Sequence, residues 1–419
     1  MTTPSTKGRL SRAAIYCATA LLAGCASLGP QLPMATPDEM DLEDVPLGVR
    51  TLAPSGNFEL LSSAEVARRL QAGLGDHPLH ILAISSGGAS GAFGAGALVG
   101  STRGGTRPEF TVVTGVSVGA LLAPFAFLGP ARDSDMAAIF TAGETDGLLQ
   151  PRVLGAVFGS SIYSGGPLRR LIEHYTNDAM IAAVAAEAAS GRLLLVATTD
   201  FATGEPVIWD LGSVALHGGS EAKPLFQAIL LASASVPGLL PPVAVRFRRE
   251  GRMREETHVD GGVTLPFFIA PAPEDLPPST AGGPQPTLVR VIIDGPLRHV
   301  PHQTHVTVFS ILSRSLSAGL SHVTRAKLES TVDALRQRRI SLEYAAIPAS
   351  YPLLGAFDFQ ARAQRSLFEY AATCAEAGRL WVSVSAGNGE RVPHESPVSG
   401  DPTCPADDAF IGRLAALEN

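Results

Sequence analysis

The chain has 419 residues, of which 45% are hydrophobic and only 17% are charged, and its formal net charge is −7. The low charge fraction argues against a disordered protein, and the acidic balance gives no basic surface with which to bind DNA or RNA. A chain of this length and apolar content can bury a large core. It fits one large α/β domain with insertions as well as two or three smaller domains.

The N-terminal segment is typical of an exported lipoprotein. Three basic residues lie within the first twelve positions, and an apolar stretch over residues 13–23 follows that is too short to cross a bilayer as a helix. The stretch runs into Leu-Ala-Gly-Cys at residues 22–25, which resembles the bacterial lipobox. The resemblance implies that residues 1–24 are a lipoprotein signal peptide and that Cys25 is lipidated. The alternative is an ordinary signal peptide with a chance cysteine.

We therefore expect the protein in the bacterial envelope, anchored to a membrane by the lipid on Cys25. The next residue is Ala26, which in lipoproteins implies sorting to the outer membrane, on its periplasmic side or at the cell surface. Residues 25–56 are rich in Pro, Asp and Glu, and they predict a tether between lipid and domain.

Beyond the tether, apolar runs that predict strands alternate with segments of helix length. The expected strands are residues 79–84, 110–114, 192–198 and 288–293. The expected helices are residues 63–70, 179–189, 225–235 and 306–339. Such alternation predicts an α/β fold with a mostly parallel central sheet and helices on both faces. We place the main domain at residues 57–345.

The remaining residues, 346–419, are expected to form an extension that packs on the same domain. They predict a helix around residues 367–370 and an edge strand at 380–384. Cys374 and Cys404 are the cysteines left after signal removal and lipidation, and they predict either one disulfide or two separate thiols.

The first motif that carries chemistry is Gly-Val-Ser-Val-Gly at residues 115–119, directly after a predicted strand and before an apolar helical stretch. In this setting the motif predicts a nucleophile elbow. Gly115 and Gly119 permit a sharp turn that lifts the Ser117 hydroxyl out of the sheet. The N-terminus of the following helix can stabilise negative charge there. A bare Gly-x-Ser-x-Gly also arises by chance, so the flanking elements carry the interpretation.

A second motif, Ser-Gly-Gly-Ala-Ser-Gly at residues 86–91, also follows a predicted strand. It predicts a cradle of backbone N–H groups at Gly87, Gly88 and Ala89 that can hold an oxyanion. A nucleotide-binding loop is disfavoured, because the P-loop lysine and the dinucleotide spacing of the glycines are absent. The plain alternative is a tight turn that binds no ligand.

The third motif is His-Val-Asp-Gly-Gly at residues 258–262. Gly261 and Gly262 allow the Asp260 carboxylate to sit in a cleft, although an Asp-Gly turn is common in its own right. His258 would point to the same side of a strand as Asp260, and a structural histidine is the better interpretation.

In this order the three motifs resemble the patatin-like phospholipase family of the bacterial lipoprotein type. The resemblance covers roughly residues 79–295, with a weaker continuation to about residue 370. It implies a three-layer α/β fold and a lipid acyl hydrolase of the phospholipase A or esterase type, with no cofactor and no metal. Ser117 would attack the ester carbonyl and form an acyl-enzyme, and Asp260 would accept the serine proton directly. The N–H groups of residues 87–89 would hold the oxyanion.

The glycine loop departs from the family pattern, which usually reads Gly-Gly-Gly-x-Arg/Lys-Gly. Ser86 replaces the first glycine, and Ser90 stands where the cation is expected. The missing cation puts in doubt the binding of a phosphate head group at that spot, which favours a neutral acyl ester over a phospholipid.

Two further functions stay open. A conventional Ser–Asp–His hydrolase would use His299, His302 or His305, which follow Asp260 in the chain. A non-enzymatic lipoprotein would use the same fold as a binding module. The three histidines lack acidic or cysteine ligands close by, so a solvated loop is favoured over a zinc site.

Overall fold

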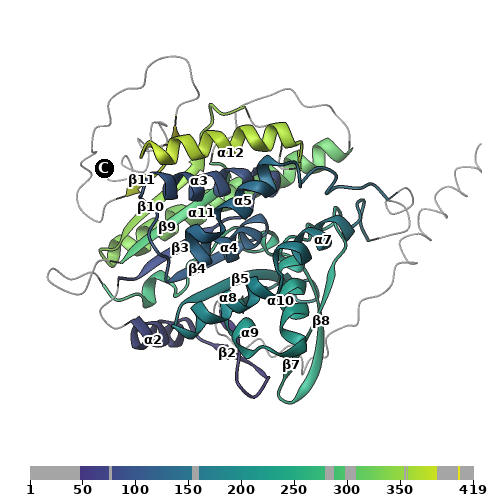
Figure 1. The fold of residues 1–419 in the computed structure, drawn as a ribbon, viewed down its shortest axis with the longest axis vertical. Coiled ribbons are helices and arrows are strands. Elements are labelled where there is room, and N and C mark those ends of the chain that lie inside the picture. Colours follow the sequence, from purple (N-terminus) through teal and green to yellow (C-terminus); the bar gives the residue numbers. More distant parts are fainter. Residues whose placement is uncertain are drawn as a thin grey trace, which may run out of the picture.

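The structure is a computed structural model that describes residues 48–74, 78–152, 160–278, 287–297, 308–352, 355, 357–384 and 404–405. Within these ranges eleven strands form one sheet (Figure 1). The order across the sheet is β11-β10-β9-β3-β4-β5-β6-β1-β2, and β8 pairs with both β5 and β7. The strands are β1 (Val49–Leu52), β2 (Phe58–Leu61), β3 (His80–Ile84), β4 (Val112–Val116), β5 (Leu193–Asp200), β6 (Pro206–Asp210), β7 (Val243–Arg249), β8 (Arg252–Asp260), β9 (Leu288–Pro296), β10 (Ser341–Ile347) and β11 (Val382–Val384).

The centre of the sheet is parallel. Strands β10, β9, β3, β4 and β5 all run in one direction. Antiparallel partners lie to either side, with β11 on β10 at one edge and β6 on β5 toward the other. Because the carboxyl ends of parallel strands meet at one edge of a sheet, loops that follow β3, β4 and β9 come together there.

Helices cover both faces of the sheet, which gives the three-layer α/β fold that the sequence predicts (Figure 1). The larger layer holds α3 (Gly91–Arg103), α4 (Val118–Leu128), α5 (Asp133–Thr141), α7 (Gly166–Tyr175), α8 (Asp178–Ala189), α9 (Leu211–His217), α10 (Gly219–Ser233) and α12 (Ala361–Glu376). The opposite layer holds α2 (Ser63–Leu74) and α11 (Val308–Gln337).

The strands are apolar on both sides because each side packs against a helical layer. In β3, Leu82 and Ile84 contribute to one core cluster, whereas Ile81 and Ala83 contribute to the other. This double burial explains why the strands read as continuous apolar runs in the sequence. The four predicted strands correspond to β3, β4, β5 and β9, and the predicted helices to α2, α8, α10 and α11, with shifted ends.

The predicted tether is wrong in its last part. Residues 1–47, including Cys25, lie outside the described residues, but Val49–Leu52 form β1. Strand β1 pairs with β2 antiparallel and with β6 parallel. Val49 is buried in the core, so packing in the sheet stabilises these residues more than exposure to water would.

The C-terminal part is built into the domain. Helix α12 packs along α3, β11 extends the sheet, and Cys374 is joined to Cys404 by a disulfide. Small residues on α3 allow this close approach. A Cβ atom on Gly96 would overlap the carbonyl oxygen of Phe368, and one on Gly100 would overlap that of Ala372.

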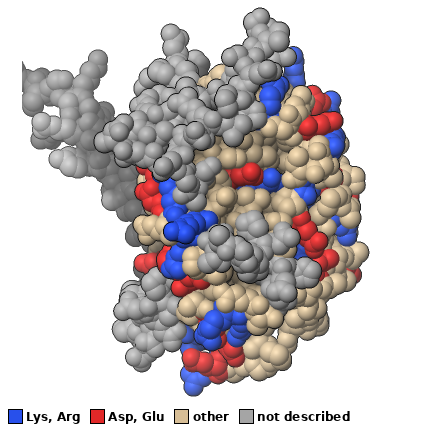
Figure 2. Space-filling view, turned by 90° about the vertical axis from the view of Figure 1, so that its left-hand side faces the viewer, with Lys and Arg blue, Asp and Glu red and all other residues tan. Residues whose placement is uncertain are grey.

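Charged side chains are dispersed over one face of the molecule (Figure 2). On the face drawn in Figure 2, acidic and basic residues are interspersed with uncharged ones, and neither sign gathers into a broad patch on the described surface. None of the helices that the structure describes combines the length and apolar character needed to cross a membrane.

The contact between α3 and α12 gives a prediction for stability. Gly100→Ala should destabilise the protein by about 1–3 kcal/mol, because the new methyl group must push α12 away from α3. Gly319→Ala is the matched control, since Gly319 lies inside α11 with no atom near its Cβ position, and it should stabilise by about 0.5–1 kcal/mol. Urea unfolding of both variants checks this. Equal changes in the free energy of unfolding of the two variants would contradict the close packing of α3 and α12.

Candidate active site

Ser117 occupies a sharp turn between β4 and α4. Its backbone has φ 57° and ψ −123°, a conformation that residues other than glycine rarely adopt. The glycines on either side make the turn possible. A Cβ atom on Gly115 would overlap the carbonyl oxygen of Gly119, and one on Gly119 would overlap that of Ile84. The geometry is the strained strand-to-helix elbow that the motif predicts.

Asp260 is brought to Ser117 by the pairing of three strands. Val116, the last residue of β4, pairs with Ala197 of β5, and the next β5 residue, Thr198, pairs with Asp260 at the end of β8. Strand β6 occupies the other edge of β5, so β4 and β8 share one edge and meet end to end. The nucleophile and the carboxylate therefore leave the sheet at the same point.

The two side chains are hydrogen-bonded. Ser117 Oγ donates to Asp260 Oδ2 at 2.5 Å. The second carboxylate oxygen, Oδ1, accepts the N–H of Gly262 at 2.7 Å. A Cβ atom on Gly261 would overlap the carbonyl oxygen of Ala197, so this tight turn requires glycine. The carboxylate is held in place from both sides.

Burial sets the proton affinity of this carboxyl group. Asp260 is only 4% exposed, and desolvation raises its pKa to about 7 although the hydrogen bonds from Ser117 and Gly262 act in the opposite direction. A carboxylate with this pKa is a much stronger base than one in water, and at neutral pH about half of the molecules still carry it in the ionised form.

The glycine loop lies beside the elbow, between β3 and α3. Gly88 lines the same pocket as Ser117, and its φ of 59° suits glycine. No described group accepts a hydrogen bond from the N–H of Gly87, Gly88 or Ala89, while the N–H of Ser90 bonds to the Gly87 carbonyl. The loop therefore keeps the three donors that the motif predicts free for a ligand.

Two residues at the site were missed by sequence reasoning. Ser233 on α10 accepts the N–H of Ser117 at 3.0 Å and donates to the Ala197 carbonyl at 2.7 Å, so it fixes the backbone of the elbow. Asp294, at the carboxyl end of β9, accepts the N–H of Gly94 at 2.8 Å, and its main chain blocks any side chain at Gly87. The one available signal was a polar residue directly after the apolar run at 288–293.

Asp294 packs against the glycine loop and the first turn of α3. It is 1% exposed, and burial raises its pKa well above the ordinary value. Its Oδ2 atom and the hydroxyl of Ser86 are two of only three buried side-chain polar atoms without a partner in the described part of the chain. Burial thus favours the neutral form of this carboxyl group beside the glycine loop.

No described histidine is hydrogen-bonded to the side chain of Ser117 or Asp260. His258 is fully buried, and its ring bonds to Thr198 at 2.9 Å and to Glu256 at 3.0 Å. The histidines at 299, 302 and 305 lie outside the described residues. Among the residues that are described, no group of three or more His, Cys, Asp or Glu side chains could hold a metal ion.

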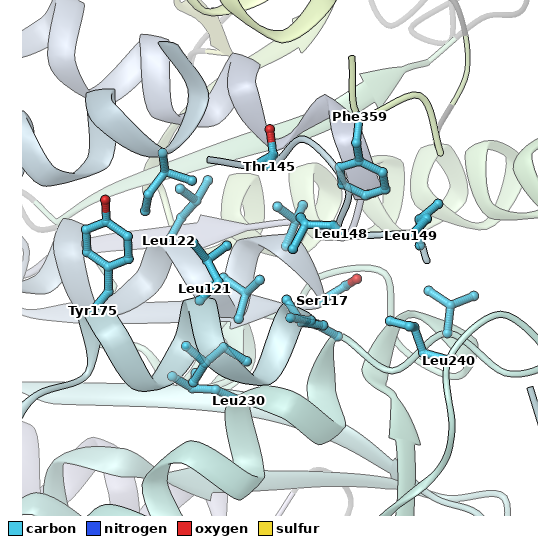
Figure 3. A pocket seen from close by; sticks show the side chains of 18 of the residues that line it. Ser117, Leu121, Leu122, Thr145, Leu148, Leu149, Tyr175, Leu230, Leu240 and Phe359 are labelled. Carbon is cyan, nitrogen blue, oxygen red and sulfur yellow. The ribbon is translucent and has the colours of Figure 1, made fainter. Parts of the chain in front are cut away.

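An apolar pocket extends from Ser117 (Figure 3). In Figure 3, Tyr175 stands at one end and Leu149 and Leu240 at the other, with Ser117 between them. Most of the wall consists of Leu, Ile and Phe side chains from α4, α5, α7, α10 and the segment before α12. The pocket is narrow, with a volume of about 110 Å³, and its chemistry suits a hydrocarbon chain.

The Ser233 contact gives a prediction for the reactivity of the elbow. Ser233→Ala would leave the buried N–H of Ser117 unpaired, which costs about 1–3 kcal/mol, and should slow reaction of Ser117 with a fluorophosphonate probe by about tenfold. Ser235→Ala is the control, because Ser235 follows the end of α10 and its hydroxyl donates to the Leu231 carbonyl and not to the elbow. The prediction is checked by measuring labelling rates at equal concentrations of folded protein, and identical rates in both variants would refute it.

The sequence and the structure were compared with known proteins, and one family model covers the residues of the site. Residues 82–272 match the family model described as patatin-like phospholipase, a range that contains the glycine loop, Ser117 and Asp260. No curated protein matches the sequence. Among solved structures, the crystal structure of VipD from Legionella pneumophila is similar at a TM-score of 0.30 and 10% identity, over 81% of this chain and 71% of that chain. Residues 82–272 are thus similar to a patatin-like phospholipase domain, and this match suggests lipid acyl hydrolase activity.

Proposed function

We propose that the protein cleaves carboxylic ester bonds of lipids through a Ser117–Asp260 dyad and an acyl-enzyme intermediate. The observation that carries the proposal is the 2.5 Å hydrogen bond from Ser117 Oγ to Asp260 Oδ2 at a strained elbow. A pocket suited to an acyl chain and a loop with free N–H donors border the same hydroxyl.

In the first half of the reaction, Asp260 takes the proton from Ser117 as Oγ attacks the ester carbonyl carbon. The oxyanion that forms is held by N–H groups of the glycine loop. When the intermediate collapses, the bond to the alcohol breaks, and Asp260 returns the proton to the departing alkoxide oxygen. The products of this half are the acyl-serine and a free alcohol.

In the second half, a water molecule takes the place of the alcohol. Asp260 accepts a proton from the water as its oxygen attacks the acyl carbon. Collapse of the second intermediate releases the fatty acid, and the proton returns to Ser117 Oγ. The apolar pocket holds the acyl chain throughout, so both steps occur with the carbonyl in one position.

The direct contact explains how the reaction proceeds without a histidine between the two residues. In a Ser–Asp–His hydrolase the carboxylate bonds to the imidazole and not to the serine. Here the Asp260 oxygen already accepts the Ser117 proton, and its other oxygen is occupied by Gly262. This arrangement favours the dyad over a triad that would use His299, His302 or His305.

We also propose that the domain works at a membrane surface, held there by the lipid on Cys25. This part rests on the lipobox at residues 22–25, on the apolar substrate pocket and on the expected outer-membrane sorting. A lipid substrate is concentrated in the membrane, so an anchored hydrolase meets it without diffusion through water.

Loss of either dyad member should abolish turnover in a protein that still folds. In Ser117→Ala we expect neither fluorophosphonate labelling nor ester hydrolysis. In Asp260→Asn we expect hydrolysis to fall by at least about a thousandfold, because an amide accepts no proton. Short-chain p-nitrophenyl esters and phospholipid vesicles are the substrates, and circular dichroism monitors folding. Retained turnover in either variant would refute the dyad, and a folded wild type that does not label would favour a binding module.

The pH dependence should report the buried carboxyl group. Burial raises the pKa of Asp260 to about 7, and the base acts only when ionised. We expect kcat/KM to rise about tenfold per pH unit below pH 7 and to level off above it. Chromatography of the released acid over a pH series checks this. A midpoint near 4 would show that the working base is a solvated carboxylate.

A further inference from the structure

The first turns of α12 lie between the glycine loop and one wall of the apolar pocket, and they carry a buried polar side chain that the proposed reaction does not use. Gln364 is only 2% exposed, whereas Gln360 at the start of the same helix is exposed. A buried amide is stable only when its nitrogen and its oxygen both find partners. The partners of Gln364 therefore show what it holds in place.

The nitrogen of the Gln364 amide bonds to the glycine loop. Nε2 donates to the Ala89 carbonyl at 3.3 Å, and the N–H at the other end of the same peptide unit, that of Ser90, donates to the Gly87 carbonyl at 3.2 Å. A peptide unit is planar, so bonds at its two ends fix its orientation. Gln364 thus holds the peptide unit that directly follows the N–H groups of Gly88 and Ala89.

The oxygen of the amide bonds to the wall of the apolar pocket. Oε1 accepts the hydroxyl of Thr145, a buried residue that lines the pocket. In Figure 3 the Thr145 hydroxyl points away from the leucines of the pocket. Because a carbonyl oxygen only accepts hydrogen bonds, the nitrogen of the Gln364 amide must face Ala89, and its oxygen is left for Thr145. One side chain therefore bridges the glycine loop and the apolar pocket.

The same part of α12 holds the pocket wall at two further points. The N–H of Ala361 donates to Asp146 Oδ1 at 3.0 Å, and Arg365 Nε donates to the Thr141 carbonyl at 2.9 Å. Both bonds lie at the surface and join α12 to the segment after α5, part of which lines the apolar pocket. Gln364 lies between these two donors in the chain and turns inward, so it connects the pocket wall to the loop.

We propose that Gln364 is a positioning residue of the hydrolase. It holds the glycine loop in the orientation that binds the oxyanion and, through Thr145, ties that orientation to the wall of the apolar pocket. The inference rests on the proposed function and extends it to a helix outside residues 82–272. Gln364 does not line the pocket itself, and its described bonds reach the reaction only through Ala89 and Thr145.

A positioning role of this kind acts on the transition state and not on the bound substrate. The oxyanion forms only after Ser117 has attacked, so a misoriented loop stabilises the transition state less while the hydrocarbon chain binds as before. The rate of acylation at saturating substrate should therefore fall, and the substrate concentration that gives half of that rate should stay the same. Single-turnover release of p-nitrophenol from a p-nitrophenyl ester measures both quantities.

The first variant, Gln364→Met, keeps the length of the side chain and removes both hydrogen bonds. We expect the acylation rate at saturation to fall by about tenfold, less than the roughly hundredfold that follows loss of a whole oxyanion donor, because the loop keeps its N–H groups. The half-saturating concentration should change by less than about twofold. Gln360→Met is the matched control, since it makes the same substitution at an exposed position of the same helix, and it should acylate at the wild-type rate.

The second variant, Gln364→Glu, separates positioning from packing. In its neutral form the introduced carboxyl group can donate to the Ala89 carbonyl and accept from Thr145, as the amide does, whereas the ionised form has no donor. Burial favours the neutral form. The acylation rate relative to wild type at the same pH should therefore approach that of wild type at acidic pH and fall as the pH rises. The comparison at equal pH removes the effect of Asp260, which titrates in both proteins. A relative rate that stays low from acidic to basic pH would overturn the proposal.

The third variant, Thr145→Val, tests the link to the apolar pocket. It leaves the Gln364 oxygen unpaired while it keeps the shape of the side chain, and it should lower the acylation rate by about threefold. Combined with Gln364→Met it should cause no further loss, because both side chains act through one bridge. Losses that multiply in the double variant would show that Thr145 acts independently, and they would overturn this link.

The outcomes keep the positioning role apart from the hydrolase function. A wild type that hydrolyses the ester while Gln364→Met acylates at the same rate would overturn the positioning role and leave the function intact. A loss that lies only in the half-saturating concentration would mean that Gln364 shapes the pocket and does not act on the loop, which overturns the proposal as well. A folded wild type that neither labels at Ser117 nor hydrolyses the ester would overturn the function itself. Circular dichroism checks folding, and if Gln364→Met does not fold, the pH profile of Gln364→Glu decides.

Discussion

The site depends on the meeting of two strands on one edge of β5. Strand β4 arrives parallel to β5 and ends at Val116, and β8 arrives antiparallel and ends at Asp260. Each strand's last residues are held by hydrogen bonds of the sheet, so Ser117 and Asp260 are positioned by strand pairing and not by a long loop. Preorganisation of this kind keeps a nucleophile and its base in contact before substrate binds.

Burial gives these groups their chemistry. Asp260 sits in a dry environment that raises its pKa to about 7, and Asp294 sits in one that raises its pKa well above the ordinary value. The two carboxyl groups differ in their hydrogen-bond partners. Asp260 receives hydrogen bonds from Ser117 and Gly262, which favour the ionised form, whereas Asp294 receives one from Gly94. One carboxyl group thus contacts the Ser117 hydroxyl directly, and the other lies beneath the glycine loop in a setting that favours its neutral form.

The C-terminal part contributes to the site although the family match ends at residue 272. Helix α12 packs on α3, which begins directly after the glycine loop, and Gln364 holds the loop through Ala89. The disulfide between Cys374 and Cys404 fixes the end of this helix to residues further along the chain. Two phenylalanines before α12, Phe357 and Phe359, line the apolar pocket, so part of its wall comes from residues outside the matched range.

The sequence by itself determined the α/β architecture and the three motifs. Strands buried on both faces must be continuously apolar, and a strained elbow or a backbone cradle needs glycine at fixed positions. Both requirements can therefore be recognised in short stretches of the sequence. The sequence could not predict Ser233 or Asp294. Serine and aspartate are common residues whose roles arise only when distant elements pack together, as when α10 brings Ser233 to the elbow and β9 brings Asp294 to the glycine loop. Likewise the sequence places residues 49–52 in the tether, because a strand of four residues is too short to show a clear pattern of apolar residues. Its pairing with β6 is visible only in the tertiary structure.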